Sequence, residues 1–194
     1  MATQRQASAA LRASEACAEL YIQLGTTDLV AAEIASRIGI AERTFYRLFP
    51  RKRDTIRPLL DHAGAVMAAS ISESVDLTVE QSLVQAFRDA FGGARKEQTG
   101  KLFPLAFRDQ GMWAVVLQSV HDGEATIRPV IAERLAVPAE DLRARVAATI
   151  FVSSVLMSLE IMVQSDADPF TTFTSVLNTA ANNPLRPTTK GRTP

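Results

Sequence analysis

The chain has few of the residues that most redox and catalytic sites use. It contains one cysteine, Cys17, so no disulfide can form within the chain, and a reducing compartment is expected. Its two histidines are far apart in sequence, and neither stands at a spacing typical of metal ligands or of a catalytic triad. No glycine-rich phosphate loop follows a strand-like segment. We therefore expect no enzymatic activity, no catalytic or metal-binding residues and no cofactor, with Cys17 an inert thiol of the core.

The sequence also lacks a net charge, having 21 basic and 21 acidic residues, which at first argues against a nucleic-acid-binding protein. The charges are distributed unevenly, however. Residues 1–57 carry nine Arg or Lys against six acidic residues, whereas residues 58–183 carry nine against fifteen. Six of the basic groups fall within 43–57, beside one aspartate. Because a polyanion responds to the local field, the zero total excludes no class of partner.

The N-terminus lacks an apolar signal core behind a basic start, so we expect a cytoplasmic protein. There is one long apolar run, the 18 residues 146–163, VAATIFVSSVLMSLEIMV. It has the minimum length of a membrane span but contains Glu160 and several hydroxyl side chains, which are costly in a bilayer. A helix buried both in a core and at a dimer interface explains the run better, and no membrane association is expected.

The apolar pattern is helical almost throughout and shows no sustained alternation, which predicts an all-α fold. We expect a DNA-binding domain at 1–56, a helical domain at 57–183 and a disordered basic tail at 184–194. The expected helices are 5–24, 29–38, 42–49, 51–73 with a kink at Pro58, 78–94, 101–109, 112–135 with a break near Gly123 or Pro129, 138–165, and 169 to 182–183.

The segment 41–49, AERTFYRLF, separates its side chains onto two faces of a helix. Phe45 and Phe49 are four residues apart and can pack together on Leu20, Ile34 and Ile38. Gly39 forms the preceding turn, and Pro50 ends the helix because it has no amide donor. The outer face then carries Glu42, Arg43, Tyr46 and Arg47. This layout is typical of a helix-turn-helix that enters the major groove of DNA.

Each polar side chain in this segment suits a particular contact with DNA. The planar guanidinium groups of Arg43 and Arg47 match the two acceptors on a guanine edge. Tyr46 and Thr44 offer hydroxyl donors for phosphate, and Lys52 adds a charge near the start of the next helix. The plain alternative is a solvated basic face on a small helical hairpin, since a generic helix-turn-helix pattern is weak by itself.

The spacing nevertheless resembles the N-terminal signature of TetR-type transcriptional regulators. The matching residues are Ile34–Ala35, Gly39–Ile40, Thr44–Phe45–Tyr46, Phe49 and Lys52, with Gly25 nine positions before Ile34. The match covers about the first 56 residues. It implies a TetR-like fold, an operator of double-stranded DNA, a homodimer and a small-molecule effector, with Glu42, Arg43, Thr44, Tyr46, Arg47 and Lys52 at the DNA.

Some positions depart from the family pattern. Ala41 stands where the family usually has Ser, so the recognition helix loses a cap worth about 1 kcal/mol. Val30 replaces a common Thr and removes one phosphate donor. Arg43 and Leu48 replace a usual small residue and a usual His, and Thr26 follows Gly25 where an aromatic often stands. Arg43 adds a possible base contact, so the operator sequence cannot be transferred from relatives.

Residues 57–183 resemble the family's C-terminal domain in architecture only, which implies a dimer and a ligand pocket. The best dimer surface is the pair of helices at 146–163 and 169–181, with Phe151, Val155, Leu159, Met162, Phe173 and Leu177. The alternative is that both helices are simply core of the monomer. The expected pocket contains Phe87, Phe91, Phe103, Phe107, Met112, Trp113 and Leu117, with His62, Arg88, Arg108 and His121 as candidate anchors. Such aromatic groups are more often plain core, and the two arginines could instead pair with Asp89 or Asp109.

These patterns favour a ligand-responsive transcriptional regulator, a repressor released from DNA by an apolar or aromatic effector. The alternative from another class is an all-α small-molecule carrier or enzyme with an unused DNA-binding-like hairpin. A third possibility is a constitutive, sequence-tolerant DNA-binding protein without a ligand.

Overall fold

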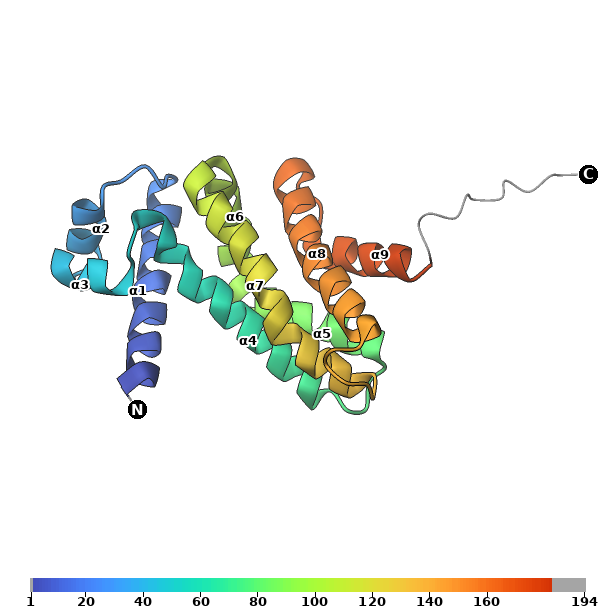
Figure 1. Cartoon of the computed structure of the whole chain (residues 1–194). Coiled ribbons are helices and arrows are strands. Elements are labelled where there is room, and N and C mark those ends of the chain that lie inside the picture. Colours follow the sequence, from blue (N-terminus) through green and yellow to red (C-terminus); the bar gives the residue numbers. More distant parts are fainter. Residues whose placement is uncertain (1, 183–194) are drawn as a thin grey trace, which may run out of the picture.

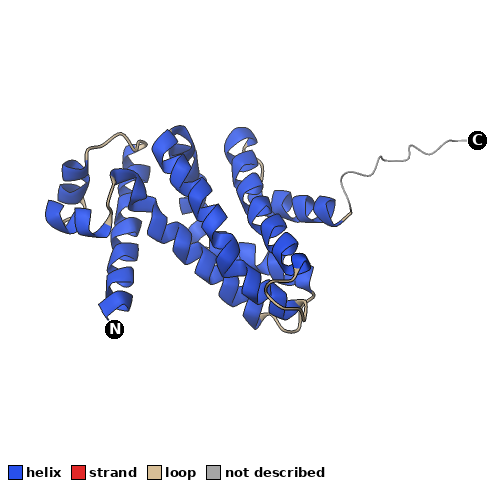
Figure 2. Cartoon of the chain, in the orientation of Figure 1, coloured by secondary structure: helices blue, strands red, loops and turns tan. Residues whose placement is uncertain are grey.

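The structure is a computed structural model that describes residues 2–182, and every regular element in that range is helical (Figures 1 and 2). This confirms the expected all-α fold. The expected disordered tail, 184–194, lies outside the described residues. The elements are α1 (Ala2–Leu24), α2 (Ala31–Arg37), α3 (Glu42–Leu48), the 3₁₀ helix η1 (Lys52–Ile56), α4 (Arg57–Glu73), α5 (Val79–Phe91), α6 (Arg95–Arg108), α7 (Gln110–Arg134), α8 (Leu142–Ser165) and α9 (Pro169–Ala181).

Residues 2–56, called here the N-terminal unit, pack around a small apolar core. The helices α2 and α3 lie together on one side of α1 (Figure 1). Tyr21, Ile34 and Phe45 are completely buried, and Phe49 is almost so. Burial of these large side chains stabilises a unit whose second and third helices have only seven residues each and could not persist alone.

Gly25 and Gly39 end α1 and α2 in the same way. Both have positive φ, +67° and +75° respectively, which glycine adopts without strain. In each case the next amide reaches back to the last helical turn, Thr26 N to Tyr21 O at 3.2 Å and Ile40 N to Ala35 O at 3.0 Å. This is the Schellman arrangement, which satisfies carbonyls at a helix end. At Gly39 this arrangement forms the sharp turn between α2 and α3.

The helix expected at 51–73 is divided differently from the prediction. Residues 52–56 form η1, and α4 begins at Arg57, so Pro58 lies in the first turn of α4. A proline is compatible with the first turn because the amides there have no partner within the helix. The predicted kink at Pro58 is therefore wrong: the change of geometry occurs before the proline.

The remaining helices form a bundle in which α7 packs against both α4 and α8 (Figure 1). The helix α6 begins at Arg95, six residues before the expected start. The helix α7 runs unbroken through Gly123 and Pro129, so the predicted break is wrong. Ile127 and Ile131, on either side of Pro129, are fully buried. Their packing holds the helix together where one backbone hydrogen bond is lost.

The side of α8 that faces the bundle carries residues predicted for the dimer surface. Phe151, Val155, Leu159, Phe173 and Leu177 are buried within the chain, and Met162 is partly buried against the same core. Phe173 makes an edge contact with Phe151 at 5.8 Å and stacks on Phe87 at 4.3 Å. The five buried side chains cannot be the surface that a second copy contacts, so this assignment is wrong for them.

The opposite side of α8 leaves apolar side chains exposed. Leu142, Val146, Ile150 and Met157 are between 36% and 72% exposed and recur at helical spacing. On length and composition α8 could cross a membrane, and it is the one helix within residues 2–182 of which this is true. A core helix of a soluble protein passes the same test, and the Phe151–Val155–Leu159 side of α8 is packed in this way.

Candidate nucleic-acid interface and internal cavity

The two faces predicted for 41–49 are those that α3 presents. Phe45 and Phe49 point into the N-terminal unit, with ring centroids 5.2 Å apart in an edge-to-face arrangement. Glu42, Arg43 and Arg47 are exposed. Tyr46 is 50% exposed, with its ring edge-on to Phe45 at 5.7 Å. The buried pair thus fixes the rotation of α3, and the outward direction of Arg43, Tyr46 and Arg47 follows from it.

The arginines of this face have no protein partner in the described part of the chain. Neither Arg43 nor Arg47 makes an ion pair or a side-chain hydrogen bond there, although Arg37 one helix earlier pairs with Glu33 at 2.9 Å. Two guanidinium groups one helical turn apart are thus available to an anionic partner. Thr44 is half-buried and so less accessible than its neighbours.

The start of α3 lacks a side-chain cap, as the sequence predicts. Ala41 occupies the capping position in an extended conformation, and no side chain accepts a hydrogen bond from the first turn. Val30 holds the same place before α2, again without a cap, and is 67% exposed. The free amides of both helices are left to solvent or to a bound anion.

Lys52 lies near this face but already has partners inside the protein. Its Nζ donates to the carbonyl of Thr27 at 3.1 Å and lies 4.0 Å from Oδ2 of Asp109. The Thr27 hydroxyl donates to the same Asp109 oxygen at 3.0 Å. The other carboxylate oxygen, Oδ1, accepts the amides of Gly111 and Met112 and so caps α7. We call Thr27, Lys52 and Asp109 the junction, because they join the N-terminal unit to the start of α7.

The sequence pattern does not predict this junction. It suggests Asp89 and Asp109 only as possible partners of nearby arginines, whereas Asp89 contacts Ser70 and Gln85 and Asp109 contacts Thr27 and Lys52. The one signal in the sequence is an aspartate directly before a helix, which favours a cap. The contact of Asp109 with Thr27, 82 positions earlier, depends on tertiary packing.

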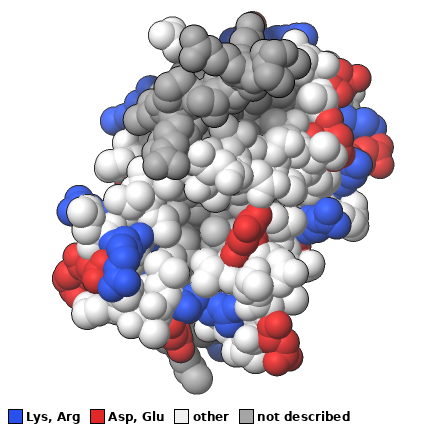
Figure 3. All heavy atoms as spheres, turned by 90° about the vertical axis from the view of Figure 1, so that its right-hand side faces the viewer, with Lys and Arg blue, Asp and Glu red and all other residues white. Residues whose placement is uncertain are grey.

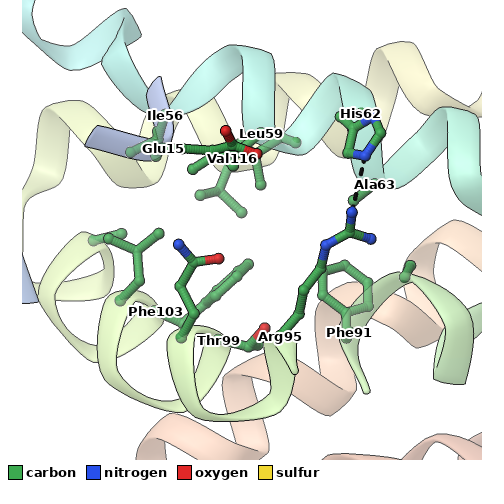
Figure 4. A pocket seen from close by; sticks show the side chains of 15 residues that line it. Glu15, Ile56, Leu59, His62, Ala63, Phe91, Arg95, Thr99, Phe103 and Val116 are labelled. Atoms are coloured by element: carbon green, nitrogen blue, oxygen red, sulfur yellow. Dashed lines mark hydrogen bonds between the residues drawn. The ribbon is translucent and has the colours of Figure 1, made fainter. Parts of the chain in front are cut away.

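A cavity of about 70 Å³ lies between α1, α4, α6 and α7 (Figure 4). Three of the residues predicted for the pocket line it, namely His62, Phe91 and Phe103. Its other apolar walls include Ile56, Leu59, Leu60, Leu102 and Val116. Two of its residues, Glu15 and Ile56, belong to the N-terminal unit, so the cavity adjoins the part of the chain that carries α3.

The other five residues predicted for the pocket lie elsewhere. Phe87 is completely buried in the aromatic cluster with Phe173, and Phe107 and Trp113 pack edge-to-face at 4.8 Å away from the cavity. Leu117 is 42% exposed and His121 is also exposed. Met112, also considered, is fully buried at the start of α7. None of these six side chains lines this cavity.

The polar groups of the cavity came mostly from positions that the sequence did not suggest. Arg95, Gln98 and Thr99 belong to the first turns of α6, a segment that the apolar pattern had left outside any helix. Glu15 comes from α1. Arg95 reaches across to α4, where its guanidinium lies 3.0 Å from Nε2 of His62. Because arginine can only donate, Nε2 of His62 is the acceptor in this contact.

A second cavity of about 50 Å³ adjoins the first. The two share the side chains of Leu60, Ala63, Phe91, Phe103 and Val116. Its remaining lining is almost wholly apolar and comes from α4, α7 and α8. Movement of the shared side chains would join the two spaces into one apolar cavity that ends at Arg95 and Glu15.

Clustered metal ligands and a reactive thiol would each indicate chemistry of another kind. No group of three or more His, Cys, Asp or Glu side chains is placed to hold a metal ion among them. Cys17 is fully buried, and desolvation raises the pKa of its thiol to about 12. Burial also raises the pKa of Tyr21, whose hydroxyl lies 3.1 Å from that of Thr55. Cys17 therefore has the character of an inert core thiol.

Comparison with known proteins links this architecture to one fold. No protein-family model matches the chain, and no curated protein matches its sequence. Among solved structures, the chain is similar to a TetR-family transcriptional regulator from Streptomyces coelicolor, with 17% sequence identity and a TM-score of 0.60. The similarity covers 89% of this chain and 81% of that one. The resemblance first seen in residues 33–56 thus extends to the whole architecture, and the chain has the TetR-type fold.

Proposed function

We propose that this protein is a homodimeric, ligand-responsive DNA-binding transcriptional regulator without enzymatic activity. It acts in the cytoplasm as a repressor that a small effector releases from its operator. The observation that carries the proposal is the outer face of α3, where Arg43 and Arg47 are exposed without a partner in the described chain while Phe45 and Phe49 fix the helix beneath them. Short helices held in this way enter the major groove of DNA.

Within this face the side chains divide between bases and phosphates. Arg43 and Arg47 reach base edges, where a bidentate contact to guanine is worth about 1–3 kcal/mol in discrimination. Tyr46 and Thr44 donate to phosphates, and Glu42 lies at the edge of the same face. Lys52 contributes positive charge from the junction, where its side chain keeps 33% of its surface exposed.

A homodimer is expected because one short recognition helix contacts few bases, whereas two reach half-sites about 34–36 Å apart. The exposed side of α8 offers a suitable surface, with Leu142, Val146, Ile150 and Met157. Figure 3 shows the side of the molecule on which α8 and α9 lie, where residues other than Lys, Arg, Asp and Glu cover much of the visible centre. Exposed apolar side chains gathered along one helix are typical of surfaces that contact another protein.

The effector would act through the contacts between the cavity and the N-terminal unit. Glu15 and Ile56 line the cavity, and the junction ties Thr27 and Lys52 to the end of α6 and the start of α7. A ligand that moves α6 would therefore move the N-terminal unit and change the separation of the two recognition helices. A typical coupling of about 1–3 kcal/mol changes DNA affinity by roughly 5–150-fold.

The proposal is tested by selecting genomic DNA fragments with the purified protein and measuring their affinity by gel shift. Replacing Arg43 and Arg47 together by alanine should weaken specific binding by at least about 10-fold, since each removes a base contact. Replacing Arg143, an exposed arginine at the start of α8, is the matched control and should leave affinity unchanged. Absence of any selected fragment would support a carrier or enzyme instead, and binding without sequence preference would support a constitutive, sequence-tolerant protein.

A further inference from the structure

Two side chains of opposite charge face each other across the 70 Å³ cavity without forming an ion pair. Arg95 enters from α6 and Glu15 from α1, on opposite sides of the space in Figure 4. Within the described residues the Arg95 side chain has one hydrogen bond, to His62, and the Glu15 carboxylate has none. Both side chains are half-buried, so each lacks part of the hydration that would otherwise satisfy it.

The Arg95 guanidinium is suited to a carboxylate ligand. It stays positively charged at any physiological pH and offers five N–H donors, of which His62 uses one. A carboxylate can accept two parallel hydrogen bonds from such a group, a stronger contact than the imidazole provides. His62 can then rotate away from the guanidinium.

Glu15 adds a second requirement, at the opposite side of the space. An ionised carboxylate only accepts hydrogen bonds, so a ligand group beside Glu15 must donate one. A ligand with nothing but a carboxylate would instead be repelled by this charge. The two walls thus favour a molecule with an anion at one end and a hydroxyl or amine donor at the other.

The cavity walls limit the size of the part between these ends. Ile56, Leu59, Leu60, Leu102, Phe103 and Val116 make the space apolar, and its volume is about 70 Å³ beside the adjoining 50 Å³. An apolar protein cavity that holds benzene measures about 150 Å³. The body of the ligand is therefore at most a short branched chain, or a single ring where the side chains shared by the two cavities move apart to receive it.

We propose that the effector of this protein is a small carboxylic acid with one apolar ring or short chain and a hydrogen-bond donor opposite the carboxylate. Arg95 binds the carboxylate, Glu15 accepts from the donor, and the apolar walls enclose the body. This assignment rests on the proposed regulatory function and gives its effector a chemical class. Because Glu15 belongs to α1 and Arg95 to α6, such a ligand would connect the N-terminal unit directly to the bundle.

Calorimetric titration of the full chain with four probe compounds, without DNA, tests the ligand class. The expected order of affinity places 4-hydroxybenzoate first, ahead of benzoate, which lacks the donor, and of 4-hydroxybenzamide, which lacks the negative charge. The isomer 2-hydroxybenzoate has the same atoms but holds both groups on one side, and it should bind at least about 10-fold more weakly than 4-hydroxybenzoate. Equal affinity for all four, or preference for the uncharged amide, would overturn the proposal.

Variants of Arg95 and Glu15 then test which residue binds which end of the ligand. Arg95→Gln should weaken 4-hydroxybenzoate by about 10- to 100-fold, as expected for loss of a hydrogen-bonded charge, and leave 4-hydroxybenzamide nearly unchanged. Lys101→Gln, which removes an exposed charge from the same helix, is the control and should change neither. Glu15→Gln should weaken 4-hydroxybenzoate while benzoate binds as well as before or better, and exposed Glu19→Gln should do neither. Opposite changes for two ligands cannot come from general damage to the fold.

The result also separates this inference from the regulatory proposal. If the chain selects specific DNA but shows none of these ligand preferences, the effector class is wrong and the regulator remains. If it binds 4-hydroxybenzoate through Arg95 and Glu15 but selects no DNA, the ligand site holds and the regulatory function fails. When both succeed, 4-hydroxybenzoate should lower DNA affinity in wild type but not in Arg95→Gln.

Discussion

The N-terminal unit and the helices that follow it use their aromatic side chains in different ways. In α3, Phe45 and Phe49 occupy one side of a seven-residue helix and thereby turn Arg43 and Arg47 outward. In the bundle, Phe173 contacts both Phe87 and Phe151, and all three side chains are completely buried. The aromatic pair of α3 orients an exposed face, whereas the cluster in the bundle contributes to the hydrophobic core. A buried aromatic residue in a short surface helix thus indicates a binding face, because its burial turns the neighbouring side chains of that helix toward the solvent.

The largest effect that tests this difference comes from two adjacent positions in α3. Phe45→Ala should lower the free energy of unfolding by about 3–5 kcal/mol, because Phe45 is completely buried. Tyr46→Ala, at a side chain 50% exposed, should stay within about 0.5 kcal/mol of wild type but weaken DNA binding. Urea denaturation and gel shift measure the two quantities. Similar losses of stability in both variants would mean that α3 does not have separate structural and binding faces.

An intermediate effect is expected where the two regions meet. Asp109→Ala removes the cap of α7 and the contacts to Thr27 and Lys52, and should cost about 2–3 kcal/mol. Asp141→Ala removes a comparable cap from α8, whose aspartate contacts only its own helix at Arg143, and should cost about 1 kcal/mol. Amide hydrogen exchange should quicken in the N-terminal unit for Asp109→Ala alone. Equal protection there in both variants would show that the junction does not hold the unit in place.

The smallest effect concerns the missing cap of α3. Ala41→Ser introduces a side-chain acceptor for the first-turn amides and should stabilise the protein by about 1 kcal/mol, without contact with the core. Thermal denaturation detects this as a rise of a few degrees. Ala41→Val, which cannot accept a hydrogen bond, should not raise the midpoint. A gain in both variants would point to a cause other than capping.

The sequence was sufficient for features that depend on local chemistry. Gly25 and Gly39 were expected to end helices, and both adopt the positive φ that makes them suitable. The two faces of α3 follow from a four-residue spacing alone. Pro58 was misjudged because its effect depends on where the helix begins, and α4 starts one residue before it. Pro129 was misjudged because packing on both sides holds α7 intact.

Features that depend on rotation or on distant contacts were beyond the sequence. The helix α8 is apolar nearly all round, so its pattern does not say whether Phe151 or Ile150 faces the interior. The polar ends of the cavity come from residues 80 positions apart, Glu15 and Arg95, which only the fold brings together. Residues that are brought together only by the tertiary fold produce no periodic pattern in the sequence.

The dual use of the Asp109 carboxylate limits how freely the regions of this protein can be exchanged. One of its oxygens serves the first turn of α7, and the other serves the loop that follows α1. A chimera that carries this N-terminal unit on a different helical body would keep Thr27 and Lys52 but lose their acceptor. The converse graft would leave a half-buried carboxylate without its donor. The two regions are therefore not independent modules, and an engineer who recombines them must transfer the junction as one piece.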